Sequence, residues 1–346
     1  MTAAHRPGIA SSRLVIVEAS GRIRHMARDA LATLLRPGDL VVVNDAATLP
    51  ASFHGTHLRS NKPIEIRLAG WVAIGDPTRF LAIAFGAGDH RTRTEDRLPP
   101  PPLTPGDRLV LGPLVAVIED ILGHPRLVAL RFEGERAAIL RGFARHGRPV
   151  QYAHVSDNLA LRDVWTPVAA EPMAFEPPSA GFALDWRILA AWRGAGIRMV
   201  GVTHAAGLSS TGDETLDARL PFDEVYRVPK ATAAAIATAK EEGRRVVAVG
   251  TTVVRCLEAA AATDALVRAG DGIARGRIGR DSGLRIVDAI LTGVHAPGES
   301  HFELLRAFAD DATLDRAFAD VAEQGYRSHE FGDSMLLESR SREAIP

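Results

Sequence analysis

The chain has 346 residues, of which 46% are hydrophobic and 24% are charged, and its formal net charge is −1. These values are typical of a globular protein with two or three domains and an ample core. The near-zero charge excludes a basic field over the whole molecule, although it leaves room for a local basic face. Cys256 is the only cysteine, which excludes an internal disulfide and an all-cysteine metal site. We expect its thiol to be buried and inert.

No apolar run approaches the roughly 20 residues that a membrane span needs. The amino terminus also lacks the apolar core of a secretory signal. These two observations favour a cytoplasmic protein without a membrane partner.

The first part of the chain combines apolar strands with a short helix. Strands are predicted at residues 13–18 and 39–43, because both runs are dominated by large apolar side chains, and a helix is predicted at 29–35. Asn44 and Asp45 follow the second strand. This pair either closes a turn through side-chain to backbone hydrogen bonds or holds a ribose and orients a reacting group.

Between residues 53 and about 151 the chain consists of short strands separated by Gly, Pro and Asp. This pattern of short strands and turn residues predicts a small antiparallel barrel or sandwich. We expect it to be inserted as a separate domain into an α/β domain formed by residues 1–52 and 152–346. The predicted strands are residues 64–69, 71–74, 79–85, 108–111, 114–121 and 126–132.

Basic residues gather around a helix predicted at residues 136–145, where Glu133 and Glu135 offset them in part. One interpretation is a solvated amphipathic face, and the other is a patch that meets RNA phosphates through arginine. The basic residues are Arg131, Arg136, Arg141, Arg145, His146 and Arg148.

After residue 151 apolar strands again alternate with helices. Strands are predicted at residues 198–203, 245–249 and 284–291, and helices at 184–193, 230–242, 299–309 and 313–324. Such an alternation predicts a largely parallel sheet covered by helices.

Four loops would meet at one edge of that sheet, where open α/β sheets bind small ligands. They carry the Asn44-Asp45 pair, His204, the Gly250-Thr251-Thr252 turn and His295. At this turn Thr251 or Thr252 can cap the next helix, and free backbone N–H groups can meet an anionic ligand. The alternatives are an ordinary βα corner and, for a lone histidine such as His204, a structural role.

Four segments resemble the signature blocks of the S-adenosylmethionine:tRNA ribosyltransferase-isomerase family of queuosine biosynthesis. They are PGDLVVVNDAATLPASFHG, VAVGTTVVRCLEA, LTGVHAP and FGDSMLL, and the resemblance extends from about residue 13 to 338. It implies an α/β domain interrupted by a β-barrel. The implied reaction moves the ribosyl part of S-adenosylmethionine onto 7-aminomethyl-7-deazaguanine in tRNA. The products are epoxyqueuosine, adenine and methionine.

The resemblance also implies how this chemistry is divided among residues. S-adenosylmethionine would be a consumed substrate, tRNA the partner, and no metal is implied. Because the sulfonium acidifies the ribose 5′-carbon, one general base would start the reaction. We expect Asp45 or His295 to transfer protons, with His204 as a further catalytic candidate. The expected substrate-binding residues are Asn44, Gly181, Glu224, Tyr226, Gly250, Thr251, Thr252, Arg255, Gly332 and Asp333.

Several positions depart from the family pattern. Ala47 and Ser52 stand where the family has arginines, and Ala183 and Phe222 stand where it has histidines. Residues 298–300 replace a basic turn. These changes remove groups suited to binding phosphate or shuttling protons. Two alternatives therefore stay open, a paralogue with a different acceptor and a non-catalytic binder of S-adenosylmethionine or a nucleoside. A monomer is the expected state.

Overall fold

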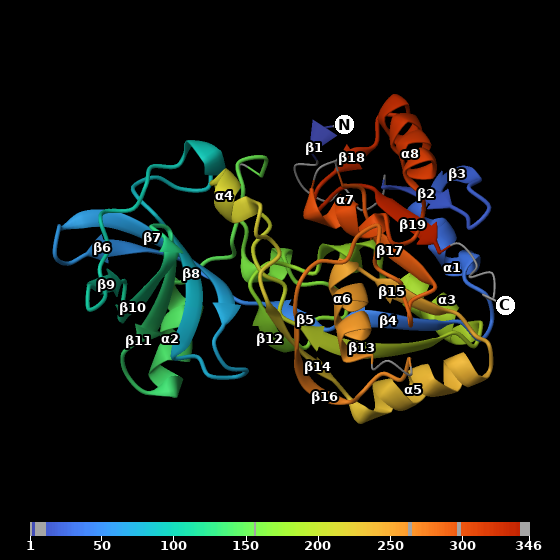
Figure 1. The fold of residues 1–346 in the computed structure, drawn as a ribbon, viewed down its shortest axis with the longest axis horizontal. Coiled ribbons are helices and arrows are strands. Elements are labelled where there is room, and N and C mark those ends of the chain that lie inside the picture. The colour runs from blue at the N-terminus through green and yellow to red at the C-terminus, as the bar shows by residue number, and fades with distance from the viewer. Residues whose placement is uncertain (1, 4–11, 156, 262–264, 296–298, 340–346) are drawn as a thin grey trace.

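A computed structural model describes residues 2–3, 12–155, 157–261, 265–295 and 299–339. It contains a nine-stranded sheet with helices on both faces and, beside it, a closed six-stranded barrel, which lies on the left in Figure 1. The α/β class and the antiparallel barrel predicted from the sequence are both confirmed. The exact domain boundaries at residues 53 and 151 stay a prediction.

The large sheet is parallel at its centre and mixed toward its edges. Its four central strands, β13, β4, β15 and β17, pair in parallel, whereas β14 and β19 run antiparallel to their inner neighbours. From edge to edge the strands are β16 (Gly270–Ala274), β14 (Glu224–Val228), β13 (Arg198–His204), β4 (Leu40–Asn44), β15 (Val246–Val249), β17 (Ala289–Gly293), β19 (Ser334–Glu338), β2 (Arg13–Val17) and β3 (Ile23–Ala27).

Alternate residues of the central strands enter two different cores, because successive side chains of a strand point to opposite faces. Val42 and Ala248 pack in the core that includes α5 (Lys230–Glu241), α6 (Thr251–Ala260), α7 (Ser300–Leu305) and α8 (Asp311–Glu323). Val41 and Val247 pack in the core that includes α1 (Leu31–Leu34) and α3 (Trp186–Gly194). Both faces of the sheet are therefore buried, which explains why these strands read as continuous apolar runs.

The described helices are short, and most match their predicted positions. They are α1 (Leu31–Leu34), α2 (Arg136–His146), α3 (Trp186–Gly194), α4 (Glu214–Asp217), α5 (Lys230–Glu241), α6 (Thr251–Ala260), α7 (Ser300–Leu305) and α8 (Asp311–Glu323). Within the described part of the chain, no helix is both long and apolar enough to cross a membrane.

The barrel closes in the order β10-β11-β8-β7-β6-β9, with every neighbouring pair antiparallel. Closure leaves no unpaired edge. Phe53, Phe80 and Phe132 pack inside it against Phe143 of α2. The strands are β6 (Ser52–His57), β7 (Lys62–Trp71), β8 (Arg79–Phe85), β9 (Arg108–Leu111), β10 (Leu114–His124) and β11 (Leu127–Phe132).

Among the described residues, two further sheets have only two strands each. Strand β5 (Ala46–Thr48) pairs in parallel with β12 (Glu171–Ala174), and β1 (Thr2–Ala3) pairs in parallel with β18 (Arg327–Ser328). Short 3₁₀ helices occupy Arg28–Ala30, Thr94–Asp96, Leu161–Asp163 and Ser179–Ala183.

Two strand predictions were wrong for identifiable reasons. The separate strand expected at residues 71–74 does not form, because Trp71 is the last residue of β7. The run at 284–291 enters the sheet only at Ala289. Before that point, the carboxylate of Glu258 accepts hydrogen bonds from the backbone N–H groups of Arg285, Ile286 and Val287 at 2.8–3.1 Å. These donors are thus unavailable to a strand partner.

Candidate active site

The turn from β15 into α6 is built around Gly250. Its φ of +97° lies in the left-handed region, and its N–H donates to the carbonyl of Leu291 at 2.8 Å. A Cβ at this position would lie 3.3 Å from the Cβ of Ala180. Gly250 is itself the N-cap, so the expected capping by Thr251 or Thr252 is wrong. Because no side chain caps the helix, its first N–H groups are offered to the space in front of it.

Asn44 connects the ends of three elements at this edge. Its Nδ2 donates to the carbonyl of His204 at 3.0 Å and to Oγ1 of Thr252 at 3.1 Å. Its Oδ1 accepts from the backbone N–H groups of Ala46 at 3.1 Å and His204 at 3.0 Å. The ends of β4, β13 and α6 therefore meet, as the parallel order of the strands predicts. Asn44 positions the corner and makes its contacts with protein groups.

A cavity of about 790 Å³ opens in front of this corner. Its volume lies within the range of about 300–1,000 Å³ that is usual for small-molecule sites. Loop residues 93–95 of the barrel line one side, so both units of the fold contribute to it. The predicted site residues on its wall are Glu224, Gly250, Thr251, Thr252, Arg255 and His295.

Glu224 and Arg255 form a buried ion pair on the cavity wall. The Arg255 Nη1 lies 3.2 Å from the Glu224 Oε2, while Glu224 Oε1 accepts from the backbone N–H of Gly207 at 2.7 Å. Burial raises the pKa of Glu224, although Arg255 opposes the rise. The imidazole of His204 lies behind the pair, with its Nε2 3.5 Å from Glu224 Oε2. Burial and Arg255 lower the pKa of His204 well below its usual range, so its ring is neutral.

His295, Glu299 and His301 form a second group on the wall. The Nδ1 of His295 lies 3.2 Å from Glu299 Oε2, and its ring stacks on that of His301 with a centroid distance of 4.5 Å. Burial favours the protonated form of Glu299, but the hydrogen bond with His295 lowers its pKa overall. Burial and the neighbouring His295 lower the pKa of His301 to about 3. His301 therefore stacks as a neutral ring.

Glu176 forms the third acidic position of the cavity. Its Oε1 accepts hydrogen bonds from the Tyr152 hydroxyl and from the backbone N–H of Ser209, the latter at 3.0 Å. Burial raises the pKa of Glu176 to about 7. A carboxyl group with this pKa exchanges its proton near neutral pH, which is the range that general acids and bases use.

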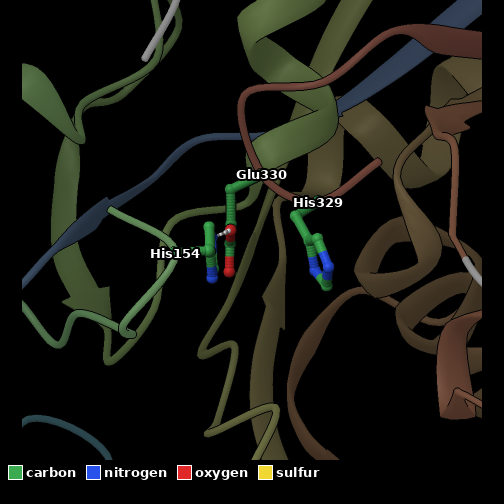
Figure 2. A group of neighbouring side chains, drawn as sticks. All are labelled: His154, His329 and Glu330. Atoms are coloured by element: carbon green, nitrogen blue, oxygen red, sulfur yellow. Dashed lines mark hydrogen bonds and ion pairs between the residues drawn. The ribbon is translucent and has the colours of Figure 1, made fainter. Parts of the chain in front are cut away.

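His154, His329 and Glu330 gather at the same cavity (Figure 2). The Nε2 of His154 lies 2.9 Å from Glu330 Oε2. Burial opposes the charged form of both partners, yet their hydrogen bond raises the pKa of His154 and lowers that of Glu330. This trio and the His295, Glu299 and His301 group are the sets of described side chains that could hold a metal ion.

Other predicted site residues lie away from the cavity wall. The Asp45 carboxylate accepts from the Thr203 hydroxyl at 2.7 Å, and burial raises the pKa of Asp45 despite that bond. Tyr226 packs in the core against Gly272, and Gly181 faces Thr166. His204 is fully buried behind the Glu224–Arg255 pair.

Gly332 and Asp333 shape the loop before β19. A Cβ at Gly332 would lie 2.5 Å from the carbonyl of Arg327, so only glycine fits this close approach. The Asp333 carboxylate accepts from the backbone N–H groups of Arg13 at 2.7 Å and Arg327 at 2.8 Å. These two residues therefore hold the loop that carries His329 and Glu330.

The departures from the family pattern have local structural consequences. Ala47 is buried in β5, and the Ser52 hydroxyl donates to Glu65 at 2.9 Å inside the barrel. Glu65 also pairs with Arg67 and Arg97.

Cys256 is buried in α6, and burial raises the pKa of its thiol, as an inert cysteine requires.

The α/β sheet, the barrel inserted into the chain, the glycine corner and the cavity lined by titratable side chains are typical of an enzyme with a small-molecule site at the carboxyl ends of its strands. The sequence model of the queuosine biosynthesis protein family matches residues 3–337. The chain belongs to this family, which confirms the resemblance seen in its four sequence blocks.

Two curated relatives align with nearly the whole chain. The S-adenosylmethionine:tRNA ribosyltransferase-isomerase of Citrifermentans bemidjiense is 32% identical, with coverage of 95% of this chain and 93% of the relative. That of Thiobacillus denitrificans is 33% identical, with coverage of 96% and 92%. The crystal structure of an S-adenosylmethionine tRNA ribosyltransferase from Thermotoga maritima superposes with a TM-score of 0.50. It is 23% identical, with coverage of 96% and 95%, and supports the fold.

Sequence reasoning missed several cavity residues, namely Tyr152, His154, Glu176, Glu299, His301, His329 and Glu330. Glu299 lies in the turn that replaces the basic residues of the family pattern, and His329 and Glu330 directly precede the FGDSMLL block. Their convergence depends on which loops meet across the sheet edge. One feature of the sequence could have indicated these residues. His and Glu lie close together in two segments, SHEF (residues 328–331) and ESHFE (residues 299–303).

Proposed function

We propose that this protein is an S-adenosylmethionine:tRNA ribosyltransferase-isomerase, which transfers and rearranges the ribosyl group of S-adenosylmethionine onto a 7-aminomethyl-7-deazaguanine base in tRNA. The observation that carries the proposal is the family match over residues 3–337, with the cavity at the matching Gly250 corner. A tRNA substrate also favours the cytoplasm as the place of action.

The cavity has the charges that the sulfonium nucleoside requires. The uncapped start of α6 suits the carboxylate of the methionine part, because the helix N-terminus carries partial positive charge. Glu224 and Glu299 on the same wall suit the sulfonium and the amine of the acceptor. The backbone at Gly250, Thr251 and Thr252 is therefore the proposed cradle for S-adenosylmethionine.

Of the two proton-transfer residues predicted from the sequence, we assign the reaction to His295. It lies on the cavity wall, and Glu299 can fix the orientation of its ring through the 3.2 Å contact with Nδ1. A neutral His295 would remove the proton from the ribose 5′-carbon that the sulfonium acidifies. Asp45 stays the second candidate, with Glu176 as a further group able to exchange a proton near neutral pH.

Adenine release tests this function. The protein is incubated with S-adenosylmethionine, with and without tRNA that carries the aminomethyl base, and free adenine is measured by chromatography. We expect release that depends on the modified tRNA. Calorimetric binding of S-adenosylmethionine with no adenine released under any condition would contradict the proposal and favour a non-catalytic binder.

One observation favours a second candidate, the same transfer to a different acceptor. The cavity wall carries six carboxylates, those of Glu95, Glu176, Asp217, Glu224, Glu299 and Glu330, against two guanidinium groups. Even with Glu176 partly protonated near pH 7, carboxylates outnumber guanidinium groups on this wall, and the excess of negative charge repels phosphate. Adenine release with the free aminomethyl base, or with another small amine, but not with tRNA would establish this alternative.

A further inference from the structure

The cavity wall contains a set of side chains whose chemistry the proposed transfer does not use. His154 comes from the segment after α2, whereas His329 and Glu330 adjoin each other in the loop before β19. Figure 2 shows the three side chains next to one another, with the His154 ring beside the Glu330 carboxylate. One ligand atom from each residue lies within 4.8 Å of the others.

From these contacts we infer that His154, His329 and Glu330 form a binding site for a divalent transition-metal ion of the zinc type. Two imidazoles and one carboxylate are a common ligand set for zinc and for other late first-row metals. The inference concerns metal binding and holds whether or not the proposed transfer is correct.

The spacing of the donor atoms fits such an ion. Zinc lies about 2.0–2.1 Å from nitrogen and oxygen ligands, so tetrahedral donors are about 3.3 Å apart. The observed separation of His154 Nε2 and Glu330 Oε2 is 2.9 Å, and the whole set stays within 4.8 Å. The rings of His154 and His329 are stacked, with centroids 4.7 Å apart and planes 23° apart. Because a metal ion lies in the plane of each imidazole that binds it, rotation of at least one ring together with small side-chain shifts would bring all three donors into coordination.

The backbone conformation of the loop places the side chains of the adjoining residues His329 and Glu330 on the same side. Successive side chains in extended backbone point in opposite directions, which would separate His329 from Glu330. His329 instead has a φ of +69°, in the left-handed region that few non-glycine residues adopt. The turn is closed by a 2.9 Å hydrogen bond from the Gly332 N–H to the His329 carbonyl. The loop is thus folded so that both side chains face His154.

Three protein ligands leave room in the coordination sphere. All three residues line the cavity, so the remaining position faces the space that we assign to substrate. A hydroxyl, carboxylate or amine of a bound molecule, or a water, would complete the sphere, as in zinc sites that keep an open position. The class of ligand is therefore a small oxygen or nitrogen donor.

Metal titration tests the site without reference to activity. Tag-free full-length protein is stripped with a chelator, and Zn²⁺ is titrated in competition with a chromophoric indicator; Co²⁺ reports coordination through its visible d–d absorption. We expect one tight equivalent that involves this trio. His329→Asn and Glu330→Gln should each weaken binding by at least about tenfold. Asparagine tolerates the left-handed backbone, so the first variant keeps the loop conformation.

His301→Ala serves as the matched control, because His301 lines the same cavity but belongs to the other group. The affinity of the His301→Ala variant for Zn²⁺ should equal that of the unmodified protein. Circular dichroism and thermal unfolding confirm that each variant is folded. The inference is overturned if stripped protein binds Zn²⁺ no more tightly than the His154→Ala/His329→Asn double variant, or if only His301→Ala weakens binding.

Discussion

His295 and Glu299 share a 3.2 Å contact at the cavity wall, while Asp45 lies behind β13 with its carboxylate on Thr203. Removal of a general base lowers turnover by about 10²–10⁴-fold. We therefore expect His295→Ala to lower kcat by this amount while its affinity for S-adenosylmethionine, measured by calorimetry, changes little. Full turnover by the variant would exclude the assignment.

Asp45→Asn, measured in the same adenine-release assay, separates the two predicted proton-transfer residues. The variant keeps an acceptor for the Thr203 hydroxyl, so the local structure is preserved. We expect a loss of turnover much smaller than that of His295→Ala. A loss as large as that of His295→Ala would return Asp45 to the role of base.

The raised pKa of Glu176 makes the free energy of unfolding depend on pH. The unfolded group ionises near 4.5 and the folded group near 7. Between these values the folded state holds the additional proton, so stability is fully present below pH 4.5 and falls as pH rises to about 7. At about 1.4 kcal/mol per pH unit, the loss amounts to about 3 kcal/mol.

Glu176→Gln removes this titration and retains an oxygen for the Tyr152 and Ser209 donors. Urea unfolding at several pH values should show that the variant gains stability relative to the unmodified protein as pH rises from about 4.5 to 7. Above about pH 7 the difference in free energy of unfolding between the two proteins should stay constant. A difference between the two proteins that does not change with pH would contradict the assigned pKa.

At the scale of elements, the βα corner depends on the backbone of Gly250. Gly250→Ala forces a side chain into the left-handed region and against Ala180, so we expect a loss of stability of about 1–3 kcal/mol and weaker binding of S-adenosylmethionine. Gly243→Ala is the matched control, because its φ is +64° and a Cβ there meets no atom within 4 Å.

Both alanine variants should lose stability in thermal unfolding, but only Gly250→Ala should bind S-adenosylmethionine more weakly in calorimetry. The reason is that only Gly250 fixes the start of α6 on the cavity. Equal affinities of the two variants would show that the corner does not hold the ligand.

Strongly patterned elements were predictable from the sequence, whereas the site was predictable only in part. The buried parallel strands and the Ala-rich helix Lys230–Glu241 follow directly from apolar periodicity. Strands β6, β14 and β16 were missed, because polar residues and glycines interrupt their apolar pattern. The corner was found because Gly250 ends an apolar run. His154 and Glu330 could not be paired, since 176 positions separate them in the chain.

At the scale of the whole molecule, the barrel provides an exposed basic face on α2. Arg141 and Arg145 are exposed there, one helical turn apart. If this face meets tRNA phosphates, Arg141→Glu/Arg145→Glu should weaken tRNA binding and reduce the slope of log affinity against log salt by about 1–2. Binding of S-adenosylmethionine should be unchanged.

The matched control is Arg187→Glu/Arg193→Glu, which reverses the charge of two exposed arginines on α3. It therefore gives the same change in net charge. Figure 1 shows α2 on the barrel and α3 in the other unit of the fold. Filter-binding or fluorescence titrations at several salt concentrations should separate the two variants. Equal losses for both would mean that net charge, and not the α2 face, governs tRNA binding.

The most direct measurement of the central claim is the chemical fate of the tRNA base. The protein is incubated with S-adenosylmethionine and tRNA that carries 7-aminomethyl-7-deazaguanine, and the nucleosides are then identified by mass spectrometry after digestion. We predict epoxyqueuosine in the tRNA together with an equal amount of released adenine. An unchanged base, under conditions in which the protein binds both S-adenosylmethionine and tRNA, would contradict the assignment.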